Sequence, residues 1–286
     1  METSLPAAGL HYGVPFETYQ SWPAVNFSTL KSIRKTPLQC KYDREHPKKS
    51  TALDEGQALH VATLEPGRFD GMFHICPPAD GRTTEGKDTL ATHSKLAAEG
   101  NKIMIREKCK EDEGKLQAIA AYRGMAAAIH NSKAARMFLH GQGQNEVSGL
   151  YRDEDTGLWC KFRIDRACDQ LEHIVEIKSC RDASPWQFGK DAHKFAYHGQ
   201  AASYVHGFRQ ITGKKYGHVI IAVESAEPHH VAVYYLDDQS LQTGLIDYRA
   251  WLKRYAECLK KNDWPGYPDL LQPLSIPDYA HHRQAA

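Results

Sequence analysis

The chain has 286 residues, of which 41% are hydrophobic and 25% charged, a composition typical of one or two globular domains. Its net charge of +1 excludes a strongly basic protein, so any nucleic-acid surface must be local. The N-terminus lacks a basic, apolar leader and no stretch is apolar enough for a membrane span, so we expect neither secretion nor membrane insertion. Seven irregularly spaced cysteines predict free thiols in a reducing cytoplasm.

The N-terminal part of the chain is predicted to be helical after an irregular arm, residues 1–25. A helix is expected to open at Asn26-Phe27-Ser28, with Ser28 as its N-cap, and to end at Pro37, before a short helix over Leu38–Glu45. This segment is rich in cations: Lys31, Arg34, Lys35, Lys41, Arg44, Lys48 and Lys49. The cluster is either a solvated helical face or a surface that contacts phosphates.

The next predicted helix, Thr51–Pro66, carries Gly56 and His60 on one face. A single histidine on a helix is more often a core or surface residue than a ligand. Phe69–Gly100 is expected to begin as a loop and to become helical from about Asp88. Further helices are predicted over Lys108–Ala128 and Ser132–Leu139, all as scaffold.

The sheet is predicted to begin at Asn145, with a strand over Glu146–Tyr151 and a polar turn after it. Two runs then alternate with a period of two, Leu158–Ala167 and His173–Cys180, and should pair as an antiparallel hairpin. Asp165 lies near the end of the first run, whereas Glu176 and Lys178 project together from the second. Their side chains should therefore meet at one edge of the sheet.

Charged residues on strands usually form solvated ion pairs worth under about 1 kcal/mol, and this interpretation competes with a functional one. Glu176, however, stands between Val175 and Ile177 in a run apolar enough for a central strand. An unpaired carboxylate would be costly there. A divalent cation beside Lys178 is a natural partner for it.

The C-terminal part begins with a predicted long helix from Ser184-Pro185 to about Phe208, on which Gln200 and Tyr204 share a face. Lys194 on the same helix is a possible phosphate contact. Strands are expected over Lys215–Glu224 and His229–Asp237. A closing helix, Ser240–Lys261, then precedes an irregular tail.

Several of these motifs together resemble a known nuclease superfamily. Asp165 followed by Glu176-Ile177-Lys178 resembles the signature of PD-(D/E)XK nucleases. Gly56-x-x-x-His60 and Gln200-x-x-x-Tyr204 resemble motifs of the RecB-type group, closest to the nuclease domain of RecE (exonuclease VIII) and its phage relatives. The resemblance implies a restriction-endonuclease-like α/β (α+β) fold, a mixed central sheet flanked by helices. We expect one domain over 26–264, helical in 26–140 and with the catalytic sheet in 141–264, and an irregular tail over 265–286.

The same resemblance implies a Mg²⁺-dependent deoxyribonuclease, in which Mn²⁺ can replace Mg²⁺. Asp165, Glu176 and the carbonyl of Ile177 would be metal ligands, joined by His60 and Glu146. Lys178 would orient or help deprotonate the attacking water. Gln200 and Tyr204 would hold the edge of the site. The expected DNA contacts are Ser28, Lys31, Arg34, Lys35 and Lys194.

The RecE-like features favour a 5′→3′ exonuclease that acts on double-stranded DNA with free ends, in a ring of three or four subunits, with a single-strand annealing recombinase as partner. An endonuclease of the same fold shares these residues. A non-catalytic DNA-binding or assembly module is disfavoured by the intact Asp165, Glu176 and Lys178. A histidine metallohydrolase is disfavoured because no helical zinc motif is present. Only Cys258 follows Cys180, so no iron–sulfur cluster is expected.

Overall fold

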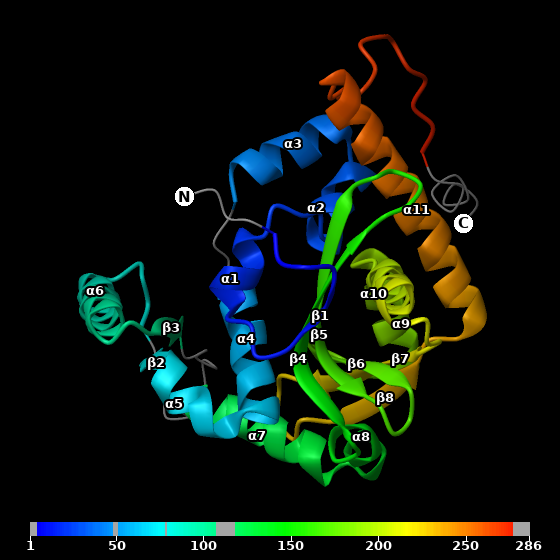
Figure 1. The fold of residues 1–286 in the computed structure, drawn as a ribbon. Coiled ribbons are helices and arrows are strands. Elements are labelled where there is room, and N and C mark those ends of the chain that lie inside the picture. Colours follow the sequence, from blue (N-terminus) through cyan, green and yellow to red (C-terminus); the bar gives the residue numbers. More distant parts are fainter. Residues whose placement is uncertain (1–4, 48–50, 78, 107–117, 277–286) are drawn as a thin grey trace, which may run out of the picture.

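The computed structural model describes residues 5–47, 51–77, 79–106 and 118–276. Its centre is a six-stranded sheet in the order β1-β4-β5-β6-β7-β8 (Figure 1). The strands are β1 (Gly9–His11), β4 (Gly143–Arg152), β5 (Trp159–Cys168), β6 (His173–Cys180), β7 (Gly217–Glu224) and β8 (Val231–Tyr235). Only the β6–β7 pair is parallel among these neighbours. The predicted mixed sheet and its antiparallel hairpin are confirmed.

Helices cover both faces of this sheet. On one face, α10 (Tyr197–Thr212) and α11 (Asp238–Lys261) pack on Ile164 and Ile174. On the other face, α4 (Thr51–Leu64) and α7 (Ala118–Asn131) pack on Val175 and Ile177. The alternating residues of β6 thus serve two cores, which explains why this strand is apolar on both sides.

The crossover from β6 to β7 consists of two helices rather than the single long one that was predicted. α9 spans Pro185–Lys194, and the chain turns at Ala196, whose φ of 57° is left-handed, before α10 begins. A helix cannot continue through that conformation. The single-helix prediction was therefore wrong at its centre, although both halves are helical.

The N-terminal arm was expected to be irregular, but it contains β1 and the short helix α1 (Phe16–Ser21). β1 is only three residues long and gains its partners from β4, over a hundred residues away, so local periodicity could not reveal it. The following helix, α2 (Phe27–Lys31), is capped by Asn26, whose side chain accepts from the Thr29 N–H, and not by Ser28. η1 (Ser32–Arg34) and α3 (Pro37–Glu45) follow, with Pro37 in the first turn of α3.

A small lobe projects from the main body (Figure 1). It contains η2 (Pro66–Arg68), α5 (Phe69–Met72), α6 (Thr84–Glu99) and a parallel pair of four-residue strands, β2 (Phe73–Cys76) and β3 (Ile103–Arg106). Both strands lie outside the predicted elements, and α6 begins four residues before the predicted Asp88 because Thr83 caps it. Part of the predicted helix Lys108–Ala128 lies outside the described residues.

The remaining helix, α8 (Lys133–Leu139), begins after Ser132 as predicted, with the Ser132 hydroxyl accepting from the Ala135 N–H. The tail has no helix or strand over its described residues 262–276. Among the helices that the structure describes, none is both long and apolar enough to cross a bilayer.

Candidate active site

Asp165 occupies the point where β5 and β6 separate. The antiparallel ladder runs from Cys168↔His173 to Arg166↔Val175. At the next position Asp165 Oδ2 instead accepts the N–H of Ile177, at 2.7 Å. The side chain therefore replaces a ladder hydrogen bond, and this fixes the carboxylate between the two strands.

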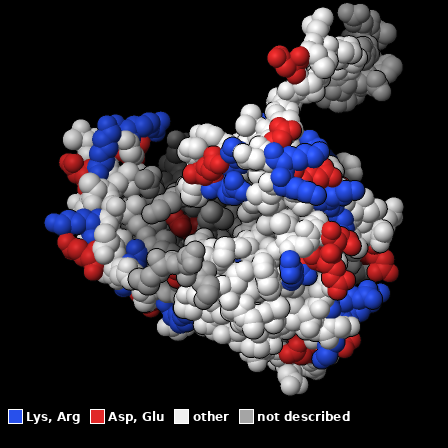
Figure 2. Space-filling view, turned by 45° about the horizontal axis from the view of Figure 1, so that its top comes forward, with Lys and Arg blue, Asp and Glu red and all other residues white. Residues whose placement is uncertain are grey.

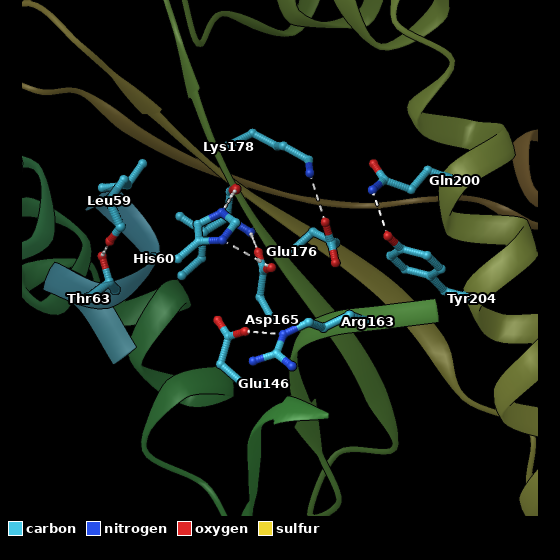
Figure 3. A network of polar contacts seen from close by, with 11 residues as sticks. Leu59, His60, Thr63, Glu146, Arg163, Asp165, Glu176, Lys178, Gln200 and Tyr204 are labelled. Carbon is cyan, nitrogen blue, oxygen red and sulfur yellow. Dashed lines mark hydrogen bonds and ion pairs between the residues drawn. The ribbon is translucent and has the colours of Figure 1, made fainter. Parts of the chain in front are cut away.

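Three acceptor groups converge beside this point (Figure 3). His60 Nδ1 lies 3.3 Å from Asp165 Oδ1, and His60 Nε2 lies 3.0 Å from the carbonyl oxygen of Ile177. One atom each from His60, Glu146 and Asp165 lie within 4.8 Å of one another. The residues come from α4, β4 and β5, so only the tertiary fold brings them together. We call these three side chains the metal cluster.

The geometry of the metal cluster suits a cation. Because a carbonyl oxygen only accepts, His60 Nε2 carries the hydrogen in its contact with Ile177, and a neutral ring then directs the Nδ1 lone pair at a carboxylate oxygen. A second proton or a cation must separate these two atoms. Adjacent ligands around an octahedral cation at ~2.1 Å lie ~3.0 Å apart and opposite ones ~4.2 Å, so the cluster is slightly more open than a filled site.

Electrostatics point the same way. Burial and the neighbouring carboxylate of Glu176 raise the pKa of Asp165 well above its usual range, against the opposite effects of His60 and Lys178. The ionised form of Asp165 is therefore disfavoured when no cation is near. Glu146 adds a further acidic group, and its φ of 52° places it in a conformation that is uncommon for residues other than glycine.

Glu176 and Lys178 form a separate, internally neutralised pair. Lys178 Nζ donates to Glu176 Oε2 at 2.7 Å, and Glu176 is only 2% exposed. Although burial disfavours the ammonium, the carboxylates of Glu176 and Asp165 raise the pKa of Lys178. No described residue gives the other oxygen, Oε1, a hydrogen bond. Glu176 stands outside the metal cluster in this geometry.

Gln200 and Tyr204, the predicted motif on α10, contact each other. Gln200 Nε2 donates to the Tyr204 hydroxyl at 2.9 Å, and Tyr204 is buried. Burial, and after it the Glu176 carboxylate, raises the pKa of Tyr204, which therefore stays neutral. The pair packs next to Glu176 on the α10 side of the sheet (Figure 3).

The structure brings together three of the predicted DNA contacts. Lys31 Nζ and Lys194 Nζ lie 5.7 and 5.3 Å from the ring centroid of Phe195, and Arg34 donates to the carbonyl of Lys194. Burial and the charges of Lys178 and Arg34 lower the pKa of Lys31, so Lys31 lies within the electrostatic field of Lys178.

The other predicted DNA contacts and the other cations of this segment do not join the group around Phe195. Ser28 is exposed on α2, and Lys35 donates to Gln39. Arg44 donates to the Tyr255 hydroxyl and lies over the Trp264 ring, so it serves packing. Lys48 and Lys49 lie outside the described residues.

Three residues near the site were missed by sequence reasoning: Lys161, Arg163 and His218. Arg163 holds Glu146, with Nε donating to Oε2 at 2.8 Å. Lys161 is buried and donates to three backbone carbonyls of the N-terminal arm. The available signal for the two cations was their position on the face of β5 that Asp165 shares in the alternating pattern, but their partners lie far away in the sequence.

The molecular surface provides access to this region. Figure 2 shows that the surface is hollowed between the lobe that carries α6 and the main body, with acidic atoms at depth. His60 and Glu146 keep 23% and 21% of their side chains exposed, whereas Asp165 keeps 9%. A small ion can therefore reach the cluster from solvent.

A mixed sheet with an aspartate at the divergence of two strands and Glu-x-Lys on the second strand is the architecture of PD-(D/E)XK domains. Residues 26–272 match the family described as PDDEXK-like domain of unknown function (DUF3799). The chain belongs to this family, which confirms the resemblance to the PD-(D/E)XK superfamily and the fold expected from the sequence. Among curated proteins no relative matches it.

Of the solved structures to which the chain is similar, the first described below shares this fold. A protein of Eubacterium rectale described as a candidate exonuclease is 17% identical, covers 95% of this chain and is itself covered completely, with a TM-score of 0.58. A phage-related exonuclease of Haemophilus somnus 129PT is 12% identical, with 65% of this chain and 90% of its own covered and a TM-score of 0.33. An alkaline exonuclease of Laribacter hongkongensis is 14% identical, with 74% and 96% covered and a TM-score of 0.26.

Proposed function

We propose that the protein is a deoxyribonuclease that requires a divalent cation. The observation that carries the proposal is the convergence of His60, Glu146 and Asp165 within ligand distance of one another, beside the buried Glu176–Lys178 pair. A structural role for three acceptors in one place would need a protein cation among them. Among the lysines and arginines of the described part of the chain, only Arg163 pairs with one of them, Glu146.

The chain's own residues divide the chemistry. Asp165, Glu146 and His60 would hold the cation, and Glu176 Oε1 and the Ile177 carbonyl would complete its surroundings. A bound Mg²⁺ would polarise a phosphate oxygen and favour ionisation of a water, and Mn²⁺ suits the imidazole ligand better. Lys178, whose raised pKa keeps it an ammonium, would stabilise negative charge on the phosphate or orient the water rather than act as a base.

The cations near Lys178 support DNA as the substrate. Lys31, Arg34 and Lys194 come from two segments separated by more than a hundred residues and meet around Phe195. Because phosphates repeat along a strand, such a cluster beside the site would hold the phosphates that flank the reacting one. Ser28 and Lys35 extend the same surface in the proposal.

The RecE-like motifs extend the proposal to a 5′→3′ exonuclease that degrades linear double-stranded DNA during recombination or repair. On the same basis we propose a ring of three or four subunits and a single-strand annealing recombinase as partner, in the cytoplasm. An endonuclease is the second candidate, because both reactions use the same residues.

The test is digestion of linear and covalently closed duplex DNA, with and without Mg²⁺ or Mn²⁺, with label at the 5′ or the 3′ end. We expect metal-dependent loss of the linear DNA, with the 5′ label released first. Cleavage of closed circles would replace the exonuclease by an endonuclease. Binding of DNA without cleavage in either metal would favour a non-catalytic module and overturn the enzymatic proposal.

A further inference from the structure

Arg163 lies at the junction between the metal cluster and the N-terminal arm. Its side chain is 15% exposed. Besides donating from Nε to Glu146 Oε2, it donates from Nη1 to the carbonyl of Val14 at 2.8 Å and to the hydroxyl of Ser148 at 3.1 Å. The guanidinium carbon also lies 6.0 Å from the ring centroid of Phe16 and 5.9 Å from that of Tyr19. Its orientation is therefore determined from several sides.

The arm itself is anchored next to Arg163. Lys161, one alternation earlier on β5, is 7% exposed and donates to the carbonyls of Tyr19, Gln20 and Trp22 at 2.8–2.9 Å. An ammonium has three hydrogens, so all of its donors are satisfied by the end of α1. A buried lysine without those carbonyls would be costly. The arm and the catalytic strand thus depend on each other.

The position of this arm relative to the family match is informative. The match begins at residue 26, yet Gly9–His11 pairs with β4, and Val14, Phe16 and Tyr19 lie against Arg163. Without its contact with Arg163, Glu146 could turn, because 21% of its side chain is exposed and a carboxylate can accept from many directions. Holding Oε2 on Arg163 leaves Oε1 as the oxygen that can face the cation.

We propose that Arg163 is a positioning residue that orients Glu146 toward His60 and Asp165, and that residues 9–22 hold Arg163 in place. The N-terminal arm is then a working part of the active site. This inference rests on the metal site of the proposed function but not on cleavage of DNA. Outer residues that orient metal ligands typically change metal affinity by about 10- to 100-fold when they are replaced.

The test measures Mn²⁺ affinity of the full chain by titration calorimetry, without DNA. We expect Arg163→Gln to weaken Mn²⁺ binding about 10- to 100-fold. Glu146→Gln should weaken binding to a similar degree, and the double variant should be no weaker than the poorer single variant, since both remove the same ligand. Arg163→Lys, which keeps one donor, should recover part of the affinity.

Arg166 provides the matched control on the same strand. It donates to Asn145 Oδ1, the Phe138 carbonyl and the Gly141 carbonyl, and to none of the metal-cluster residues. Arg166→Lys should retain Mn²⁺ affinity even where it lowers the melting temperature. A purely structural role for Arg163 would lower the melting temperature of Arg163→Gln and leave Mn²⁺ affinity unchanged, which would overturn the inference.

The contribution of the arm is tested by Phe16→Ala against Tyr12→Ala. Both residues belong to the exposed part of the surface, at 39% for Phe16 and 57% for Tyr12, so neither change should unfold the protein, but of the two only Phe16 lies over Arg163. We expect weaker Mn²⁺ binding for Phe16→Ala alone. Equal affinity of the two variants would remove the arm from the proposal.

If these affinities behave as expected while no DNA is cleaved, the inference stands and the nuclease proposal falls. Wild-type protein that binds no Mn²⁺ overturns both.

Discussion

The two halves of the candidate active site accommodate buried charge in opposite ways. In the first half, His60, Glu146 and Asp165 present acceptor atoms to one another, and burial together with Glu176 raises the pKa of Asp165. In the second half, the carboxylate of Glu176 is paired with the ammonium of Lys178 at 2.7 Å. The first half requires a cation from outside, whereas the second carries its own.

This difference assigns different consequences to replacements in the two halves. Removing a charge from the first half relieves repulsion when no metal is present and abolishes the response to metal. Removing Lys178 from the second half leaves a buried carboxylate without its partner. The same loss of activity should therefore accompany opposite changes in stability.

The largest expected effect is on activity in the second half. We expect Lys178→Ala to lower the rate of DNA cleavage by at least about 10²- to 10³-fold, because the proposed role of its ammonium is to stabilise phosphate charge. It should also lower the free energy of unfolding, and adding Glu176→Gln should restore stability but not activity. Cleavage assays and urea unfolding measure the two. Lys190→Ala, on the exposed side of α9 over Trp186, is the control, and near-normal cleavage by Lys178→Ala would contradict the assignment.

In the first half, Asp165→Asn should abolish the stabilisation by metal. For the wild type, Mn²⁺ at about 100 times its dissociation constant should add about 2.7 kcal/mol to the free energy of unfolding. The variant should gain little, yet it should be at least as stable as the wild type in EDTA, because the amide oxygen can still accept the Ile177 N–H without a buried charge. Thermal melts with and without Mn²⁺ measure this. A variant that is much less stable than the wild type in EDTA would show that the charge of Asp165 does not destabilise the metal-free protein.

His218 on β7 lies beneath the second half and gives it a pH dependence of its own. Burial lowers the pKa of His218 to about 4, and no described residue gives either ring nitrogen a hydrogen bond. Below pH 6.5 the unfolded chain binds a proton at this residue that the folded chain does not, so the free energy of unfolding falls as the pH drops toward 4. His218→Leu should remove about 2 kcal/mol of this loss between pH 7 and pH 5. Urea unfolding at both pH values measures this. If the free energy of unfolding fell equally for the variant and the wild type between pH 7 and pH 5, the ring would not be buried in its neutral form.

The smallest effect is expected at the edge of the second half. Tyr204→Phe removes the hydroxyl that accepts from Gln200 and should lower the free energy of unfolding by about 1 kcal/mol. The control is Tyr255→Phe on α11, which removes the hydroxyl to which Arg44 donates. It should lower the free energy of unfolding by a similar amount. If Gln200 and Tyr204 hold the edge of the active site, only Tyr204→Phe should slow cleavage. Equal activities would reduce the pair to packing.

Much of this comparison follows from local patterns in the sequence. The strands of Asp165 and of Glu176 and Lys178 were predicted because their alternation is local and strong. His60 was singled out because Gly56-x-x-x-His60 resembles a motif of the RecB-type nucleases. Arg163, Lys161 and His218 were not, because a charged or aromatic side chain on a strand has no local signature that separates a solvated face from a buried contact.

The sequence by itself determined β4 to β8 and most of the helices, since period-two and period-3.6 patterns depend on near neighbours. Its motifs also indicated the superfamily and the pairing of Asp165 with a Glu-x-Lys strand. Tertiary structure alone decided that β5 and β6 separate at Asp165, that His60 reaches the Ile177 carbonyl, and that the N-terminal arm anchors on Lys161 and Arg163. These contacts join segments up to about 150 residues apart. Their free energies depend on burial and on partners that no local pattern specifies.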